Sequence, residues 1–259
     1  MTYSKINWQT APGHQVLAAA GKTILRPGGR AATDQLLAWA DFRPGETVLE
    51  LASSFGYSAI ALARQFGVRV VGIEANVASV AQARANIANA GLADQIDIIE
   101  GNIFNLDQIQ EQFDYVLAEA ILTMQSAPGK EKLLSLIGDR IKPGGTFLSH
   151  ELVIYGHQAD VHRALSEAIR VNATPLSESG WIDACQQAGL SVNQHHTGDM
   201  RLLDPRQMLD DEGPVRVLKI FWSVLTRPNI RQRIFGMRRA FQTHRDELGY
   251  IILCAQKHS

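Results

Sequence analysis

Between Thr47 and Ile154, short apolar runs alternate five times with helix-like segments, and this alternation constrains the fold more than any other feature. Short apolar runs bounded by turn residues are typical of buried strands, and apolar residues at helical spacing lie between them. A strand–helix order predicts a parallel sheet covered by helices on both faces. The expected strands are residues 47–51, 68–74, 96–100, 113–118 and 146–154.

Two further strands are expected near the end of the chain, at residues 190–197 and 250–256. Together the strands predict an α/β fold: a doubly wound, mostly parallel, seven-stranded Rossmann-like sheet. Pro143 and Gly144 should end the last helix of the alternation, since proline cannot continue a helix. The expected helices are residues 14–20, 31–40, 57–63, 78–90, 106–111, 130–141, 160–171 and 177–188.

The composition excludes several classes of protein. A net charge of -1 argues against wholesale binding to nucleic acid, and no apolar run is long enough for stable membrane insertion. Two cysteines, Cys185 and Cys254, are too few for a secreted disulfide framework. The first residues lack the pattern of a signal peptide. We therefore expect a cytoplasmic protein.

The first strand leads into a turn of small residues that favours a ligand site. Ala52, Ser53, Ser54 and Gly56 allow a ligand to approach the backbone closely. Open parallel sheets bind ligands beyond the carboxyl ends of their strands, and this turn lies at such an end. Glu50 would repel a pyrophosphate, but its charge suits the ammonium group of a methionine moiety.

The next three strands also end in polar side chains. Glu74, followed by Ala75, is able to accept hydrogen bonds from both hydroxyls of a ribose. Asn102 and Ile103 are suited to the edge and face of an adenine, and Glu119 would lie next to the sulfonium. Each residue also has a plainer interpretation, as a helix cap, a turn residue or a solvated carboxylate.

The segments VLELASSFG, VVGIE, GNI, FDYVLAEA and KPGGTF, in this order, resemble class I S-adenosylmethionine-dependent methyltransferases. The resemblance covers roughly residues 30–155, and the final strand pair is compatible with that family's antiparallel seventh strand. Within the family, the chain is similar to small-molecule methyltransferases of ubiquinone and menaquinone biosynthesis. The resemblance implies that Glu50 and the Ala52–Gly56 turn hold the methionine part, Glu74 the ribose, and Asn102 and Ile103 the adenine.

Three positions distinguish this chain within the resemblance. The family usually has glycine where Ala52 and Ser54 stand, and commonly aspartate at Asn102. Enzymes that methylate exocyclic base amines tend to carry an Asn/Asp-Pro-Pro-aromatic tetrad after the fourth strand. The sequence there is Ala118-Glu119-Ala120-Ile121, which argues against that substrate class.

His150 and Glu151, near the end of the fifth strand, are the candidates for acid–base chemistry. His150 is a candidate general base for an attacking hydroxyl, amine or thiol, and a structural histidine is the alternative. Strand alternation lets only one of the pair face the pocket. His195 and His196 have no partner at metal-ligand spacing, so we expect no metal.

The two ends of the chain are expected to form the substrate side. Residues 1–30 are interpreted as an N-terminal lid segment, and residues 31–259 as the cofactor-binding domain with a helical insertion at about 201–245. The insertion contains ten of the 25 Lys and Arg residues. They form a solvated basic face, a lid that favours a carboxylate or phosphate, or a contact with an anionic membrane that delivers a lipophilic substrate.

The sequence therefore predicts methyl transfer from S-adenosylmethionine to a small-molecule acceptor, either anionic or lipophilic. One alternative is an NAD-dependent oxidoreductase, because Glu74 would also suit a nicotinamide ribose, although no G-x-G-x-x-G motif is present. The other is a non-catalytic regulator that binds S-adenosylmethionine. A homodimer is one of the assemblies that the sequence leaves open.

Overall fold

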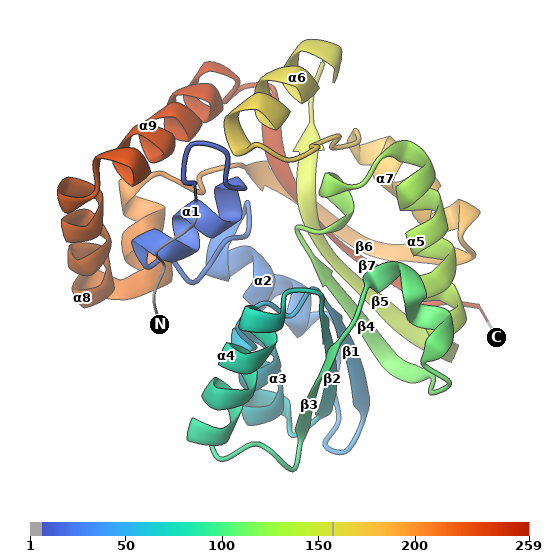
Figure 1. Cartoon of the computed structure of the whole chain (residues 1–259). Helices are drawn as coiled ribbons and strands as arrows, with labels where there is room; N and C mark the ends of the chain where they lie inside the picture. Colours follow the sequence, from blue (N-terminus) through green and yellow to red (C-terminus); the bar gives the residue numbers. More distant parts are fainter. Residues whose placement is uncertain (1–6, 157, 259) are drawn as a thin grey trace.

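The computed structural model describes residues 7–156 and 158–258, which form a seven-stranded sheet covered by helices (Figure 1). The strand order is β3-β2-β1-β4-β5-β7-β6. Only β7 runs antiparallel to its neighbours, β5 and β6. This confirms the predicted fold class. The strands are β1 (Thr47–Leu51), β2 (Arg69–Glu74), β3 (Ile96–Glu100), β4 (Phe113–Glu119), β5 (Ile141–Ile154), β6 (Leu190–Asp199) and β7 (Leu248–Lys257).

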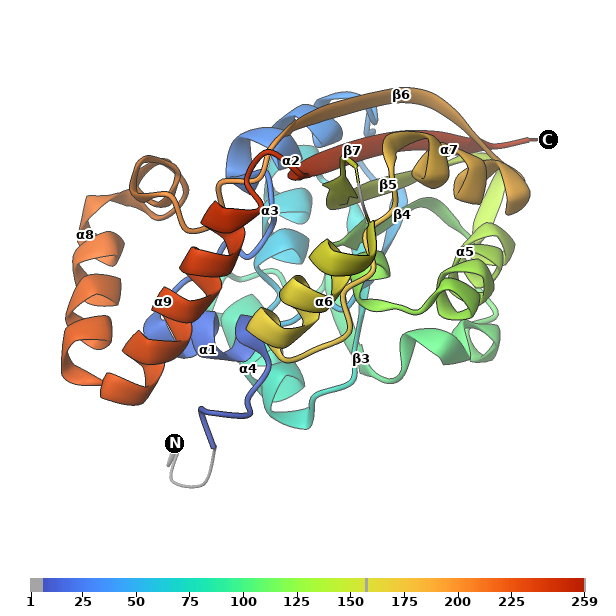
Figure 2. The same ribbon diagram turned by 90° about the horizontal axis from the view of Figure 1, so that it is seen from above.

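Helices cover both faces of the sheet and also form a separate group at one end (Figures 1 and 2). The helices are α1 (Gly13–Ala20), α2 (Gly29–Ala38), α3 (Tyr57–Phe66), α4 (Val77–Asn89), α5 (Ala127–Arg140), α6 (Gln158–Ile169), α7 (Glu178–Gln187), α8 (Pro205–Thr226) and α9 (Pro228–Thr243). Two short 3₁₀ helices, η1 (Ile103–Gln108) and η2 (Leu122–Met124), follow β3 and β4.

Alternation along the strands sends side chains into two cores. Val48 packs on one face with apolar residues of α2, α3 and α4, whereas Leu49 packs on the other with residues of α5 and α7. Trp181 and Cys185 of α7 are fully buried there, and Cys185 and Cys254 are free thiols. The two-sided core holds the carboxyl ends of β1 to β4 in one row.

Two local predictions were wrong. β5 begins at Ile141 rather than Thr146, because Ile141 already pairs with Phe113 before the Lys142–Gly145 segment bulges out. Gly144 provides the positive φ (76°) that this bulge requires. The predicted helix at 106–111 is instead η1, which starts earlier because the Asn102 side chain accepts a hydrogen bond from the Phe104 amide.

A cap composed of α1, α6, α8 and α9 has its own apolar core. Val16 and Leu17 of α1 pack against Ile220 of α8 and Met237 of α9. The cap therefore joins the N-terminal segment to the late insertion, although about 200 residues separate them along the chain. Residues 1–6 of the predicted lid segment lie outside the described residues. Within the described residues, no helix is both long and apolar enough to cross a membrane.

Candidate functional site

The turn after β1 has a backbone that is unusual for its residues. Ala52 and Ser54 adopt left-handed φ values of 56° and 50°, and Gly56 follows with 74°. The Gly56 amide donates to the carbonyl of Ser53, and the Ser53 amide donates to the carbonyl of Ile73 on β2. Neighbouring backbone thus holds the two non-glycine residues in a conformation that usually costs about 1–2 kcal/mol each. The turn therefore has a fixed backbone conformation just before the start of α3.

Glu74 fastens this turn to the end of β2. Its carboxylate accepts hydrogen bonds from the amides of Ser54 (2.9 Å) and Asn76 (2.8 Å). The carbonyl of Glu74 accepts from the amide of Gly101, which brings the end of β3 alongside. Each carboxylate oxygen retains room for a further donor, since each has about two lone-pair sites. The structure therefore brings Glu74 and the β1 turn together, as the sequence predicts.

The other residues predicted to bind the cofactor after β2 and β3 lie beside Glu74. Ala75 is exposed directly after β2, and Asn102 caps η1 through its side-chain oxygen at 2.9 Å from the Phe104 amide. Ile103 is partly buried against the core on the α5 side of the sheet. Asn102 thus caps a turn, which was its plainer interpretation. The NH2 group of its side chain stays available to a ligand.

Glu50 is a buried carboxylate with an incomplete set of partners. Its residue is only 4% exposed, and its Oε2 atom has no hydrogen-bond partner. Burial and the nearby charge of Glu119 raise the pKa of Glu50 to about 7. A buried acceptor that lacks a donor is costly unless a ligand supplies one. This atom is therefore suited to a cationic or hydrogen-bond-donating group of a ligand.

Glu119, in contrast, is fully partnered by residues that the sequence did not single out. Arg26 forms an ion pair with its Oε2 at 2.7 Å and also contacts Ser58. Ser58 donates to Oε2 at 3.1 Å, and Thr33 donates to Oε1 at 2.9 Å. The charge of Glu119 is thus neutralised by Arg26 from the N-terminal segment.

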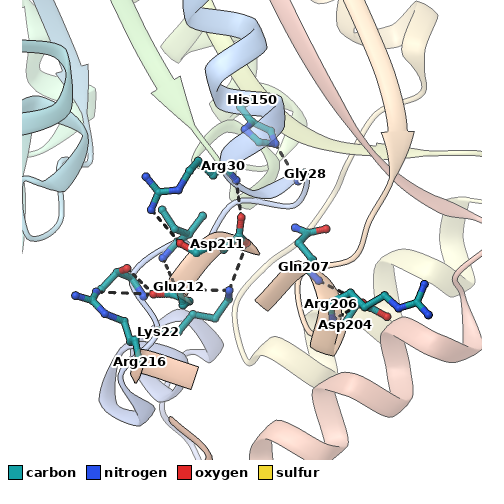
Figure 3. Close-up of polar contacts among 12 residues, drawn as sticks. Lys22, Gly28, Arg30, His150, Asp204, Arg206, Gln207, Asp211, Glu212 and Arg216 are labelled. Atoms are coloured by element: carbon teal, nitrogen blue, oxygen red, sulfur yellow. Dashed lines mark hydrogen bonds and ion pairs between the residues drawn. The ribbon is translucent and has the colours of Figure 1, made fainter. Parts of the chain in front are cut away.

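His150 extends this network to the N-terminal segment (Figure 3). The Gly28 amide donates to its Nε2 at 3.0 Å, and its Nδ1 lies 3.0 Å from the hydroxyl of Thr33. With Nε2 accepting, a neutral ring carries its proton on Nδ1 and donates it to Thr33, which in turn donates to Glu119. Burial, aided by the charge of Arg26, lowers the pKa of His150 to about 3. Neither ring nitrogen of His150 is therefore free to take a proton from a molecule that is to be methylated.

Glu151 lies on the opposite face of β5 and shapes the loop after β4. Its carboxylate accepts hydrogen bonds from the amides of Ile121 (3.1 Å), Leu122 (2.9 Å) and Thr123 (2.8 Å), and from the Thr123 hydroxyl (2.6 Å). Ala120, just before, has a left-handed φ of 55°. The His150–Glu151 pair was visible in the sequence, but its role in shaping a loop was not.

An apolar cavity of about 70 Å³ lies under the cap, between Ala120 and α9. Among the described residues, its only polar side chains are the imidazole of His14 and the hydroxyl of Thr123, and Glu151 already accepts a hydrogen bond from that hydroxyl. The rest of the wall is apolar. It consists of Gly13, Leu17, Leu25, Pro27, Ala120, Met124, Leu152, Leu165, Ile169, Val171, Met200, Leu202, Met237 and Phe241.

The arginines of the insertion lie elsewhere. Arg233 is buried and donates to the carbonyls of Ala168 and Ala11, so it joins α9 to α6 and the N-terminal segment. A second, outer groove of about 630 Å³ adjoins the cavity through Met200, Leu202 and Phe241. Its wall carries Arg201, Arg206, Arg238 and Arg245, together with Asp199, Asp204 and Asp246. No arginine of the described chain lines the apolar cavity itself.

Comparison with known proteins is consistent with this geometry. Residues 48–145 match the family model described as a methyltransferase domain. An uncharacterised protein of Haemophilus influenzae is 37% identical over 95% of this chain and 98% of its own length. A solved methyltransferase of Geobacter sulfurreducens, in complex with S-adenosyl-L-homocysteine, superposes with a TM-score of 0.71 at 18% identity, covering 94% of this chain and 98% of that one. Residues 48–145 are therefore a methyltransferase domain, and the chain has the fold of the class I S-adenosylmethionine-dependent methyltransferases.

S-adenosylmethionine is therefore the cofactor of this methyltransferase. The site suits it: the unpartnered oxygen of Glu50 matches an ammonium group, and Glu74 retains acceptor sites for ribose hydroxyls. Another relative, the sterol 24-C-methyltransferase of Saccharomyces cerevisiae, is 31% identical over 51% of this chain. That match covers 35% of the yeast protein.

Proposed function

We propose that this methyltransferase transfers the methyl group of S-adenosylmethionine to a small, predominantly apolar acceptor bound in the cavity under the cap. The observation that carries this proposal is the apolar wall of that cavity, which adjoins Ala120 at the end of β4. Buried apolar surface stabilises a ligand by about 25 cal/mol per Å². An anionic acceptor would find no arginine or lysine among the described residues of the wall.

For the cofactor, the proposed contacts follow the strand ends. Glu50 and the turn residues Ala52, Ser53, Ser54 and Gly56 hold the methionine part, and Glu74 with Ala75 holds the ribose. Asn102 and Ile103 contact the adenine, through the free amide and the aliphatic side chain. Their support is geometric: all of them lie at adjacent ends in the order β3-β2-β1-β4.

Glu119 and His150 are proposed as positioning residues, because both carboxylate oxygens of Glu119 and both ring nitrogens of His150 already have partners within the chain. Together with Arg26 and Thr33 they hold the N-terminal segment over the turn after β1. The bound cofactor supplies an activated methyl group on a sulfonium. The chain then contributes alignment and exclusion of water, which account for much of such a rate enhancement.

His14 is proposed to accept the proton that some methyl acceptors must lose during the reaction. It is the only ionisable side chain in the described cavity wall, and no described residue forms a hydrogen bond with its ring. Although His14 is an exposed residue, desolvation of its ring lowers its pKa against the opposing charge of Glu74, so the neutral form predominates at pH 7. A neutral imidazole is able to accept a proton.

One relative supports an apolar acceptor by analogy. The yeast relative is by name a methyltransferase of sterols, which are apolar. The resemblance to methyltransferases of quinone biosynthesis points to the same class, since quinone precursors are largely apolar. The volume of about 70 Å³ admits the reacting end of such a molecule, so a larger acceptor requires α9 to move.

Calorimetry and labelled methyl transfer test the proposal. We expect the purified chain to bind S-adenosylhomocysteine and not NAD, and to methylate members of a panel of apolar acceptors. Replacing Val171→Phe should fill the cavity, raise the acceptor KM and leave affinity for S-adenosylhomocysteine unchanged. Tight cofactor binding without transfer to any acceptor would instead support the non-catalytic regulator, and tight NAD binding the oxidoreductase.

A further inference from the structure

The outer surface of α8 and α9 is unlike the rest of the molecule. Of the eleven large apolar residues that are exposed in the described chain, seven lie on these two helices. Among them, Leu218 is 68% exposed and Trp222 is 69% exposed. The seven are Leu209, Val215, Leu218, Phe221, Trp222, Leu225 and Phe235.

The apolar residues of α8 form a continuous stripe. Gly213 and Pro214 interrupt α8, and beyond them Val215, Leu218, Phe221, Trp222 and Leu225 recur at intervals of one to four residues. At about 100° per residue, these positions fall on one side of the helix. Ile220, on the opposite side, is buried against the cap core. The helix thus has one apolar side inside the protein and another in solvent.

The charged residues of this part of the chain are all positive. Between residues 213 and 243 there are seven Lys and Arg residues and no Asp or Glu. Lys219, Arg231 and Arg239 form no ion pair or side-chain hydrogen bond with described residues. A second copy of the chain would bring the same charges against this surface, so self-association through it is disfavoured. Trp, Phe and Leu beside Lys and Arg suit an anionic lipid surface, where rings enter the acyl boundary and cations meet headgroups.

We propose that the outer surface of α8 and α9 docks on lipid bilayers that contain anionic headgroups. The two helices lie side by side at the outer edge of the molecule in both views, without the sheet in front of them (Figures 1 and 2). Met237 and Phe241, on the inner side of α9, line the apolar cavity. Docking therefore leaves one helix between the bilayer and the acceptor cavity.

Vesicle binding by the full chain tests this proposal without cofactor or acceptor, so its outcome is independent of the proposed function. We expect the chain to co-sediment with vesicles of equal parts phosphatidylglycerol and phosphatidylcholine, and not with phosphatidylcholine alone. Raised salt should release it. Trp222 fluorescence should shift to shorter wavelength on binding, and Trp222→Phe should remove the shift while binding persists.

Two sets of variants separate the apolar and electrostatic contributions. Lys219→Gln, Arg231→Gln and Arg239→Gln together should weaken partition at least about tenfold, since each cation near an anionic surface contributes about 1 kcal/mol. Phe221→Ser with Trp222→Ser should have a similar effect. The matched control, Arg43→Gln, Arg69→Gln and Arg163→Gln, removes three exposed charges elsewhere and should leave partition unchanged.

Three results would overturn the proposal. They are the absence of binding to anionic vesicles at low salt, equal loss of binding in the control variant, and a stable dimer in sedimentation that Phe221→Ser with Trp222→Ser abolishes. The last result would assign the surface to a second copy of the chain. Unchanged affinity of each variant for S-adenosylhomocysteine verifies that it is folded.

Discussion

At the scale of single residues, Glu50 connects cofactor binding to pH. In the free protein its pKa is raised to about 7 by burial and by Glu119, so near neutrality it is partly protonated. If it holds the ammonium group, only the ionised form binds well. Affinity for S-adenosylhomocysteine should then be constant above pH 7 and fall by up to about tenfold per pH unit below it. Calorimetry across this range, in buffers of different ionisation enthalpy, should also detect proton release on binding.

Glu50→Gln should remove this pH dependence and weaken cofactor binding by at least about tenfold. The same change should stabilise the free protein above pH 7. Because the folded-state pKa is raised, the wild type loses stability as pH rises from the unfolded value of about 4.5 through 7. In urea denaturation at pH 8, the free energy of unfolding of Glu50→Gln should therefore exceed that of the wild type by a difference on the order of 2 kcal/mol. A loss of stability together with unchanged affinity would contradict this role for Glu50.

Gly72, which the sequence analysis did not identify, allows the cofactor turn to pack on β2. A Cβ at this position would lie 2.6 Å from Cδ1 of Ile98 and 3.0 Å from Cβ of Ser53. Gly72→Ala should therefore displace the turn, lower the free energy of unfolding by about 2 kcal/mol and weaken cofactor binding. Gly236→Ala is a control for chain stiffening, since open space surrounds that glycine and its φ is not positive. Equal effects of the two changes on cofactor affinity would refute the packing argument.

At the scale of elements, a buried charge cluster joins the N-terminal segment to α8 (Figure 3). Lys22 lies 3.6 Å from Glu212 and 3.7 Å from Asp211. Glu212 also accepts hydrogen bonds from the amides of Thr23 (2.7 Å) and Ile24 (2.9 Å). Burial alone would raise the pKa of Glu212, but these donors and Lys22 outweigh it and hold the pKa below its usual value. The stability that it contributes is present above pH 4.5 and is lost as pH falls further.

Glu212→Gln should destabilise the protein by about 3 kcal/mol, because it leaves Lys22 buried with one carboxylate. In this variant, proteases should also cleave the N-terminal segment before they cleave the sheet. Arg216, which is 3.8 Å from Glu212 and half exposed, supplies the control: Arg216→Gln should have little effect. Urea denaturation and limited proteolysis measure both. Equal effects of the two changes would contradict the importance of burial.

The sequence predicted elements better than it predicted contacts between them. The alternating strands and the row of polar strand ends followed from local patterns, and the antiparallel last strand was expected from the family resemblance. The network of Arg26, Thr33, Ser58 and His150 around Glu119 did not, because its members are 32 to 117 residues apart wherever they bond one another. No local spacing encodes such contacts. Likewise, His14 joined the cavity only because α1 packs in the cap.

At the scale of the whole molecule, the chain has three regions with different chemistry. The carboxyl edge of the sheet presents the small-residue turn and the acidic side chains that we propose as the cofactor site. The cavity beneath the cap is apolar, and the outer surface of α8 and α9 is apolar and basic. Their succession suits a methyltransferase that draws an apolar acceptor from a lipid surface.

At this scale, the most direct test is transfer of labelled methyl groups to a total cell extract. The extract is divided after reaction with methyl-labelled S-adenosylmethionine into organic-soluble and aqueous fractions, and products are identified by mass spectrometry. We predict label in an organic-soluble small molecule with the wild-type chain, and little with Glu50→Gln or Val171→Phe. Label confined to the aqueous fraction, or transfer that both variants leave unchanged, would contradict an apolar acceptor in this cavity.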